Sequence, residues 1–531
     1  MDIPDIPEIA FTRREVLEGA ASWGLKYVAS RLFLSQLGSA LAGEEERGSV
    51  ARKGPNYAIV VRDSTYRSRW GRAVDALRNK YPTAHIVKFS DNIERTGDEL
   101  REQQPTHVAY VATPDELAIP EMPTSEELQR AVAERSSAGR FNRLLSNLDD
   151  DGYRDAIGGI ITGFAPEDAV GLAEAQPFEI DYALFKTQDE YSNDSISEFP
   201  RAVSFSGGIC LPSDGVYVKK RTKNGEGVIE SRVSLAGPDL LAALKSGELD
   251  LLATIGDADP VRWRTSFNYK DYVFEADGRG NIVVRDQEER IIGGLSSPNP
   301  KVYWGVGHHQ LARIKSRTES LPLSWIHSGG VKQLFGYLTD MRYGFASIGL
   351  QNHLFASDRP TFFEARHMND LAMKYLVEKL DQYCRSRGIE VDSREGGRRY
   401  DEHIFLGFGD PALDVRIRRD PNSVPLLGKG MEVDRVGNRK GYRFSVTVNK
   451  DCTLNTGASA EKPVISPPVF LLPEKIKSLQ NVRATEGLKY HIGDDFVVFD
   501  IGSNIVVENG SAKLVPTQLA AGQTWELSFT S

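Results

Sequence analysis

Short apolar runs alternate with helical patterns along most of the chain. Residues 57–61 form an apolar run typical of a buried strand, and Trp70, Val74, Leu77 and Tyr81 follow at spacings of three and four, the period of a helix. Further runs of strand length lie at 86–89, 107–112, 156–163, 202–210, 249–255, 301–306 and 404–408, and helical patterns lie at 166–169, 238–244, 330–338 and 370–384. This alternation predicts a parallel sheet with helices on its faces.

The pattern changes after about residue 425, where no strong helical period remains. Strand-like runs at 442–448, 496–500 and 525–529 are separated by Gly, Asn, Asp and Pro turns. Such spacing predicts a small β-sandwich. The chain therefore divides into an α/β subdomain over 55–155, a second α/β domain over 156–424 and a β-sandwich over 425–531.

The composition excludes some classes of protein and site but does not indicate a function. The 531 residues are 40% hydrophobic and 26% charged, which is ordinary for a globular protein, and they exceed what one core usually supports. A formal charge of −9 with no basic block argues against a nucleic-acid partner. The cysteines, Cys210, Cys384 and Cys452, lack the spacing of a zinc or thioredoxin-like site.

The N-terminus has the pattern of an export signal. Arg13 and Arg14 precede a weakly apolar stretch that ends in Ala-Leu-Ala at 40–42, as in a bacterial twin-arginine signal peptide with its cleavage site. Lys26 and Arg31 interrupt the stretch, so it is a poor membrane span. We expect a signal peptide over 1–42 and a linker over 43–54; a cytoplasmic amphipathic helix is the competing interpretation.

Three stretches, in one order along the chain, resemble the gingipain family of caspase-like peptidases. They cover 157–169, 240–263 and 297–337, and a Gly-Asp-Pro sequence at 409–411 resembles the end of the family's domain. Gly159 stands where the family has an arginine. The resemblance covers roughly 57–531. It implies a caspase-like, mostly parallel sheet flanked by helices, followed by an immunoglobulin-like β-sandwich.

The resemblance also implies where the chemistry would lie. The family uses a cysteine thiolate and a histidine on the loops that follow two sheet strands, at the edge where α/β sheets bind ligands. Here Asp257 stands at the histidine position, and His309, or less closely His308, at the cysteine position. Aspartate is a poor proton shuttle near neutral pH, and imidazole is a rare nucleophile. The chain therefore resembles a peptidase homologue without the dyad, which acts as a peptide- or protein-binding module and needs no cofactor.

Two other site chemistries stay open. Cys210 follows a predicted strand among glycines and, with His308, could make the chain an active cysteine endopeptidase with a displaced nucleophile; a buried structural thiol is the competing interpretation. Asp257, His308 and His309 could bind a divalent ion, with His327 approaching them, but adjacent histidines on a turn cannot easily bind one ion. An ordinary polar loop is the alternative.

The remaining cysteine and tryptophan residues are expected to be structural rather than part of a site. Cys384 lies on an apolar helix face, and Cys452 belongs to the C-terminal β region. Trp263, Trp304 and Trp325 could line a cleft, but aromatic residues more often fill cores. The decisive architectural expectation is that 251–255 and 301–306 form neighbouring parallel strands whose carboxyl ends open into one cleft.

Export has a direct test. N-terminal sequencing of the protein from the producing cell should begin at or near Gly43, because the Ala-Leu-Ala sequence at 40–42 provides the small residues that cleavage requires. An intact Met1 on most of the soluble cytosolic protein would refute this expectation.

Overall fold

The computed structural model describes residues 55–187, 199–206, 216–221, 231–233, 236–254, 257–265, 272–306, 310–340, 344–392, 395–401, 403–419, 424–436, 439–454 and 465–531. No helix in these ranges is both long and apolar enough to cross a membrane.

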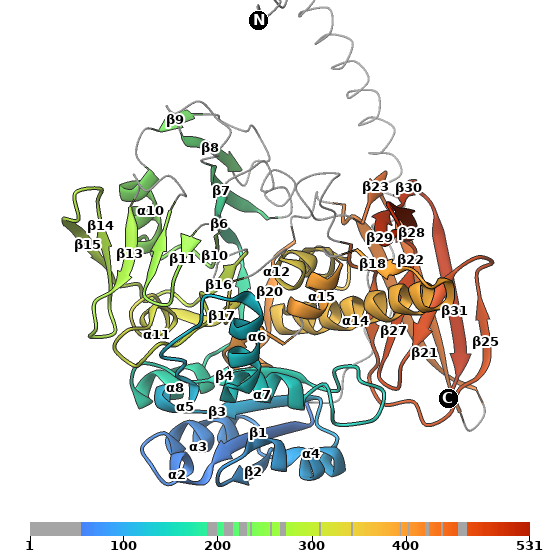
Figure 1. Ribbon diagram of the computed structural model, residues 1–531, viewed down its shortest axis with the longest axis horizontal. Helices are drawn as coiled ribbons and strands as arrows, with labels where there is room; N and C mark the ends of the chain where they lie inside the picture. Colours follow the sequence, from blue (N-terminus) through green and yellow to red (C-terminus); the bar gives the residue numbers. More distant parts are fainter. Residues whose placement is uncertain are drawn as a thin grey trace, which may run out of the picture. The chain divides into compact units, whose positions relative to one another are not determined.

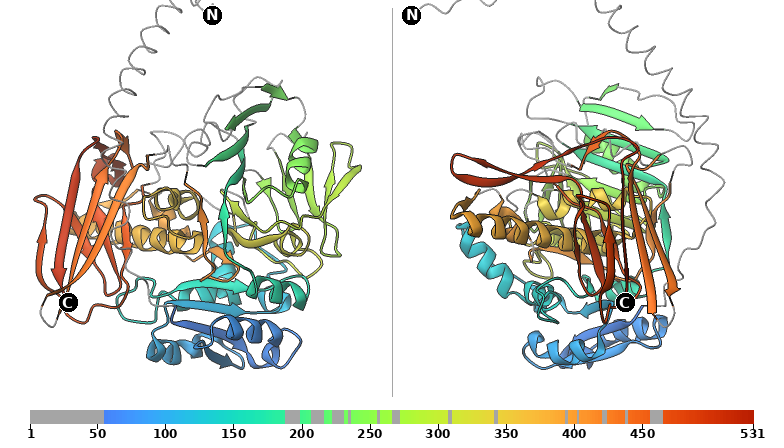
Figure 2. Two further views of the ribbon diagram at one scale, coloured as in Figure 1. Left: turned by 180° about the vertical axis from the view of Figure 1, so that it is seen from behind. Right: turned by 90° about the vertical axis from the view of Figure 1, so that its right-hand side faces the viewer.

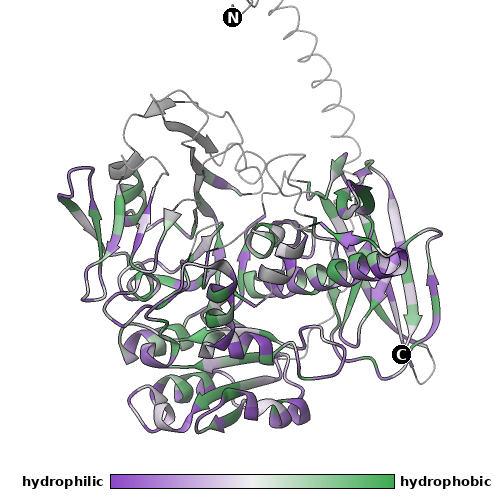
Figure 3. Ribbon diagram, in the orientation of Figure 1, coloured by the Kyte–Doolittle hydropathy of each residue, from purple (hydrophilic) through white to green (hydrophobic). Residues whose placement is uncertain are grey.

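A sheet of twelve strands forms the centre of the α/β part (Figure 1). Its strands, in spatial order, are β2 (His85–Phe89), β1 (Tyr57–Arg62), β3 (His107–Val111), β4 (Ile157–Ile161), β19 (Phe405–Phe408), β17 (Val331–Tyr337), β16 (Lys301–Gly305), β10 (Leu251–Thr254), β6 (Tyr182–Thr187), β7 (Arg201–Ser206), β8 (Val216–Arg221) and β9 (Ser231–Val233). Most of the central strands are buried along their whole length, and Figure 3 shows hydrophobic residues along them. Near-continuous apolar runs are what strands buried on both faces require.

Ten of the twelve strands form two parallel blocks of opposite direction, and β8 and β9 extend the second block by antiparallel pairing. Strands β2, β1, β3, β4 and β19 run one way. Strands β17, β16, β10, β6 and β7 run the other way, and the blocks meet where β17 pairs with β19 antiparallel, with Leu334 opposite Phe408. The carboxyl ends of the two blocks therefore lie at opposite edges of the sheet.

Helices flank this sheet. Their bounds are α2 (Asp63–Tyr66), α3 (Gly71–Lys80), η1 (Ile93–Thr96), α4 (Gly97–Gln103), α5 (Pro114–Leu117), α6 (Glu126–Arg135), α7 (Ser137–Leu144), α8 (Pro166–Ala173), α10 (Ala236–Lys245), α11 (Leu321–His327), α12 (Phe345–Gly349), α13 (Gln351–Leu354), α14 (Phe362–Arg387) and α15 (Gly396–Asp401). The longest, α14, begins at a capping box of Thr361 and Glu364 and ends at Gly388 in the left-handed conformation, which are standard start and stop signals.

A second, antiparallel sheet lies between β10 and β16 in the chain. Its strands are β11 (Asp257–Ala258), β12 (Arg262–Arg264), β13 (Val273–Ala276), β14 (Ile282–Arg285) and β15 (Ile291–Leu295). Trp263 and Phe274 on this sheet stack near Trp325 of α11 and so join the main core. Two further strands, β5 (Phe178–Ile180) and β20 (Val415–Ile417), pair parallel.

The C-terminal part is built from antiparallel sheets (Figure 2). One contains β21 (Leu427–Val436), β22 (Arg439–Val448), β31 (Thr524–Thr530) and β25 (Gln480–Ala484); a second contains β24 (Val469–Leu471), β27 (Phe496–Asp500) and β26 (Lys489–Ile492). Strands β28 (Ser503–Glu508) and β29 (Ser511–Pro516) pair antiparallel, with β18 (Glu390–Val391) beside β29, and β23 (Cys452–Thr453) pairs with β30 (Gln518–Leu519).

Apolar contacts bind the C-terminal sheets to each other and to α14. Phe444 and Phe529 of the first sheet share a core with Phe499 of the second. The neighbours of Phe499 on β27, Phe496 and Val498, pack instead with α14. Because alternate residues of a strand face opposite sides, β27 is buried on both faces. The antiparallel sheets of the predicted C-terminal sandwich are confirmed. That these sheets are arranged as in an immunoglobulin domain stays a prediction.

One element differs from its prediction. Residues 330–338, expected to be helical, contain the strand β17, which is buried along nearly all of its length. The apolar residues of this segment, Val331, Leu334, Phe335 and Leu338, have the spacing of a helix, which is why the sequence pattern favoured one. Here the backbone pairs with β16 on one side and β19 on the other, and these pairings decide the outcome.

Asp410, in the predicted Gly-Asp-Pro ending, is a buried anchor. Its carboxylate accepts hydrogen bonds from Tyr57 Oη at 2.9 Å, Tyr81 Oη at 2.7 Å and Lys80 Nζ at 2.8 Å. Nearby, a β-carbon on Gly159 would lie 2.4 Å from the carbonyl oxygen of Gly409. The close approach of β4 to this turn leaves no room for a side chain at Gly159.

Removing the Asp410 carboxylate should destabilise the fold strongly. We expect Asp410→Ala to lower the free energy of unfolding by about 3 to 5 kcal/mol, because it leaves Lys80 and two tyrosine hydroxyls without their acceptor. Asp414→Ala is the matched control; this exposed carboxylate pairs with Arg416 near the surface, so about 1 kcal/mol or less is expected. Urea denaturation measures both, and similar losses would contradict the role of Asp410.

Buried neutral histidines should make the protein sensitive to acid. Burial lowers the pKa of His403 to about 3, with a contribution from Arg154. A base whose pKa is lower in the folded state takes up its proton on unfolding, so stability falls as the pH drops below about 6.5. At about pH 5 this histidine alone should cost on the order of 2 kcal/mol.

The measurement is the urea midpoint at about pH 7.5 and about pH 5. His403→Gln should lose less stability between these values than the parent protein, whereas His85→Gln, at an exposed position, should behave like the parent. His353 and His367 are also buried with lowered pKa values, so His403→Gln should keep part of the pH dependence. Equal pH dependence in all three proteins would show that His403 is not responsible.

Candidate functional site

The two strands that were expected to carry the site are neighbours. β10 and β16 pair parallel, with Ala253 opposite Trp304 and Thr254 opposite Gly305. The backbone amide of Val306 continues the ladder to the carbonyl of Thr254 at 2.8 Å. The expectation of adjacent parallel strands is confirmed, and the segments that leave them start side by side at one edge of the sheet.

The predicted site side chains themselves fall outside the described residues. This holds for His308, His309 and Cys210 and for the side chain of Asp257. The backbone of Asp257 is described: it belongs to β11 and pairs with Arg264 of β12. The roles given to these four residues therefore stay predictions.

The two described cysteines have the surroundings of structural thiols. Cys384 is buried on α14, where it packs with Leu380 and Ala512. Cys452 is half-buried in β23, beside the C-terminal core. Burial raises the pKa of both thiols, and a neighbouring aspartate raises each further. Neither is an activated nucleophile, since activation requires a lowered pKa.

The three tryptophans fill the core rather than a cleft. Trp263, Trp304 and Trp325 have no exposed surface. The ring of Trp325 lies 4.7 Å from that of Tyr303, and the indole of Trp304 donates to the carbonyl of Ser347 at 3.2 Å. The core interpretation is confirmed for all three.

His327 lies at the other edge of the sheet. It ends α11, and β17 begins at Val331, so His327 lies near the amino ends of the block that contains β10 and β16. Its Nδ1 lies 3.0 Å from both carboxylate oxygens of Asp168, and Oδ2 of Asp168 also accepts from the amide of Ala165 at the start of α8. This pair links α11 to α8, which is a structural role.

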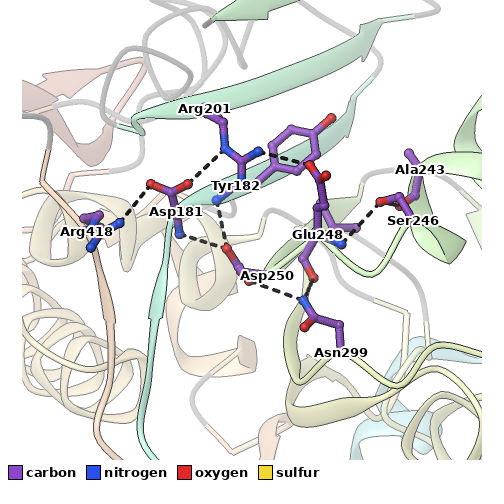
Figure 4. Close-up of polar contacts among 10 residues, drawn as sticks. Asp181, Tyr182, Arg201, Ala243, Ser246, Glu248, Asp250, Asn299 and Arg418 are labelled. Carbon is purple, nitrogen blue, oxygen red and sulfur yellow. Dashed lines mark hydrogen bonds and ion pairs between the residues drawn. The ribbon is translucent and has the colours of Figure 1, made fainter. Parts of the chain in front are cut away.

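A polar network closes the amino ends of β6, β7 and β10 (Figure 4). Asp250 Oδ2 accepts from the amides of Asp181 and Tyr182, each at 2.9 Å. Arg201 bridges Asp181 and Glu248 at 2.9 and 3.0 Å. Burial raises the pKa of Asp250, so these hydrogen bonds are needed to hold its charge. Ligand chemistry is accordingly expected at the carboxyl edge.

Below the carboxyl end of β17 lies a buried carboxyl group that sequence reasoning missed. Asp401 has no exposed surface and accepts from Tyr337 Oη at 3.2 Å and from the amide of Ala346 at 3.3 Å. Tyr337 Oη in turn accepts from the amide of Ser347 at 3.0 Å. Burial raises the pKa of Asp401 to about 7. No sequence motif marks this group, because its contacts join residues about 60 positions apart.

A second missed group adjoins the end of the predicted His308–His309 turn. Gln310 Nε2 donates to Asp340 Oδ1 at 3.0 Å, and Arg313 Nη1 donates to Gln310 Oε1 at 2.6 Å. The amide of Gln310 donates to the carbonyl of Thr339 at 3.3 Å. These bonds fix the first described residue after that turn to the carboxyl end of β17.

A polar pocket of about 630 Å³ is lined by the segments after β10 and β16 and by the end of β13. It is lined by Asp259, Pro260, Val261, Arg262, Glu275, Ala276, Asp277, Gly278, Arg313, Lys315, Thr318 and Glu319. Most of its charges are paired within the wall: Arg262 lies 3.1 Å from Glu275, and Lys315 lies 2.8 Å from Glu319. The lining therefore carries both carboxylates and cations.

One cluster has the composition of a metal site but lies elsewhere. Asp149, Asp151 and Asp494 bring carboxylate oxygens within 4.8 Å of one another, and the cluster is exposed at Asp151. Lys475 Nζ lies 2.6 Å from Asp494 and 3.6 Å from Asp149 and already supplies a counter-charge. The cluster belongs to the junction with the C-terminal sheets, away from β10 and β16.

Comparison with known proteins gives a likeness of fold only. No family model matches the sequence, and no curated protein is similar to it. Among solved structures, the complex of the pro- and mature domains of Porphyromonas gingivalis RgpB matches 87% of this chain and 99% of its own, with 10% identity and a TM-score of 0.40. The Arg-specific cysteine proteinase gingipain R matches 88% of this chain and 99% of its own, with 9% identity and a TM-score of 0.42. Likeness at this level concerns the course of the chain and not the side chains of a site.

Proposed function

We propose that the chain is an exported peptidase homologue that binds a peptide or protein segment without cleaving it by cysteine–histidine chemistry. The observation that supports this most directly is the parallel pairing of β10 with β16. It brings together the start of two segments that carry Asp257 and the His308–His309 pair where a cysteine peptidase of the resembled kind would carry its histidine and cysteine.

The described surroundings agree with binding rather than thiol chemistry. Both described thiols have raised pKa values and lie in packed regions away from these strands. The polar pocket along the same segments offers paired charges that could hold a polar chain. A site that keeps its frame but lacks a nucleophile retains binding and loses most of its rate.

Catalysis is the first arm of the test. Purified mature protein should not cleave peptides after Arg or Lys, and iodoacetamide should not label it stoichiometrically. The reason is that Asp257 and His309, which have no thiol, occupy the positions of the resembled dyad. Cys210→Ser should leave any activity or binding unchanged. Thiol-dependent cleavage that disappears in Cys210→Ser would instead show an active cysteine endopeptidase with a displaced nucleophile.

Binding is the second arm. A displayed library of random peptides should be enriched on the natural protein and much less on a variant with both Asp257→Ala and His309→Ala. His85→Ala, at an exposed position in β2, is the matched control and should enrich the same peptides. No enrichment on the natural protein, or equal enrichment on the double variant, would refute a binding site at these strands.

Asp257→His combined with His309→Cys restores the residue types of the resembled dyad and could recover slight hydrolysis of the same peptides.

A further inference from the structure

A short segment of the C-terminal part is buried against helices of the α/β part. Ile465 and Ser466, which precede β24, are 1% and 0% exposed. The side chain of Ile465 packs with Leu376 of α14, and Arg398 of α15 donates to its carbonyl oxygen at 3.2 Å. Residues 465–466, called the strap from here on, therefore join the C-terminal sheets to α14 and α15, which lie beside α12 in Figure 1.

The Ser466 hydroxyl is held between two buried side chains. Its Oγ donates to Asn369 Oδ1 at 2.8 Å and lies 2.8 Å from His353 Nε2. The Nδ2 of Asn369 donates to two carbonyls of α12, those of Phe345 and Ala346, each at 3.2 Å. Because the amide nitrogen donates twice, the amide oxygen accepts from Ser466. Burial keeps His353 neutral by lowering its pKa, so its Nε2 carries the proton that Ser466 accepts.

α12 carries this connection to the ends of two central strands. The amide of Ser347 donates to Oη of Tyr337, the last residue of β17, at 3.0 Å, and Trp304 of β16 donates to the carbonyl of Ser347 at 3.2 Å. The amide of Ala346 donates to Asp401 Oδ2 at 3.3 Å. Amides in the first turn of a helix have no helical acceptor, and Tyr337 and Asp401 take that place.

α12 fits closely against Asn369. A β-carbon on Gly349 would lie 2.3 Å from Asn369 Oδ1, so this approach requires glycine. The polar side chains that connect the strap to β17 are at most 1% exposed: Ser466, His353, Asn369, Asp401 and Tyr337. Hydrogen bonds in such a dry environment strengthen one another, so a loss at one end weakens the contacts at the other.

We propose that Ser466 is a positioning residue: through Asn369 it holds α12, and so it couples the C-terminal sheets to the carboxyl ends of β16 and β17. The strap thereby makes the C-terminal part a support for the central sheet. This inference goes beyond the proposed function, because it concerns described residues and holds whether or not a peptide binds.

Hydrogen–deuterium exchange of the full chain, read by mass spectrometry, tests the strap. In Ser466→Ala, peptides that span α12 should exchange about tenfold faster, because Asn369 loses its donor and holds the helix less firmly. Peptides of β1 should keep their rate and so exclude a general loss of stability.

Ser503→Ala is the matched control. Ser503 is 6% exposed at the same junction, where its Oγ accepts from Lys379 of α14 at 2.7 Å and donates to Asp500 at 2.5 Å. This variant also loses a buried hydroxyl that links the C-terminal sheets to α14, but that hydroxyl has no part in the contacts between Asn369 and α12. Exchange in α12 should therefore stay at the rate of the natural protein.

Two further variants test the connection at other points. Asn369→Asp keeps the acceptor for Ser466 but cannot donate to α12, so it should also accelerate exchange there. Tyr337→Phe removes the acceptor of the Ser347 amide. If one network is responsible, the double variant of Ser466→Ala and Tyr337→Phe should exchange more slowly than the product of the two single effects.

Three results would overturn the proposal. These are unchanged α12 exchange in Ser466→Ala or in Asn369→Asp, an equal rise in Ser503→Ala, and single effects that simply multiply in the double variant. A rise in the β1 peptides as large as that in α12 would also contradict it, because Ser466 would then support the whole fold and not α12 in particular. Peptide binding can fail or succeed independently of each of these outcomes.

Discussion

The buried Asp410 carboxylate is the interaction on which the architecture depends. β19 is the last strand of its block and the one that pairs antiparallel with the other block, so its position determines how the two halves of the sheet meet. Asp410 follows β19 directly and receives hydrogen bonds from β1 and from the end of α3. A charge without exposed surface is tolerated only with such partners, which makes the connection specific as well as strong.

The opposed directions of the two blocks decide which edge can bind. The amino ends of β6, β7 and β10 are closed by the network around Asp250, and the amino end of β17 is held by His327 and Asp168. The segments after β10, β16 and β17 leave from the other edge of the sheet.

Much of the frame could be read from the sequence, and the reasons are local. Strands such as 57–61 and 301–306 are buried on both faces, so their apolar runs stand out. The β17 segment was misread because Val331, Leu334 and Phe335, with Leu338 after them, have the spacing of a helix although the backbone forms a strand. The sheet from β11 to β15 was not predicted, because its strands have only two to five residues.

The site was less accessible to sequence reasoning because its supports are non-local. Asp401 contacts Tyr337 across 64 positions, and Arg313 contacts Ile119 across 194. The sequence around Gln310 does not predict its left-handed backbone conformation, since glutamine has no preference for that conformation. Strain of this kind persists only where surrounding bonds determine the conformation, and here they come from three separate segments.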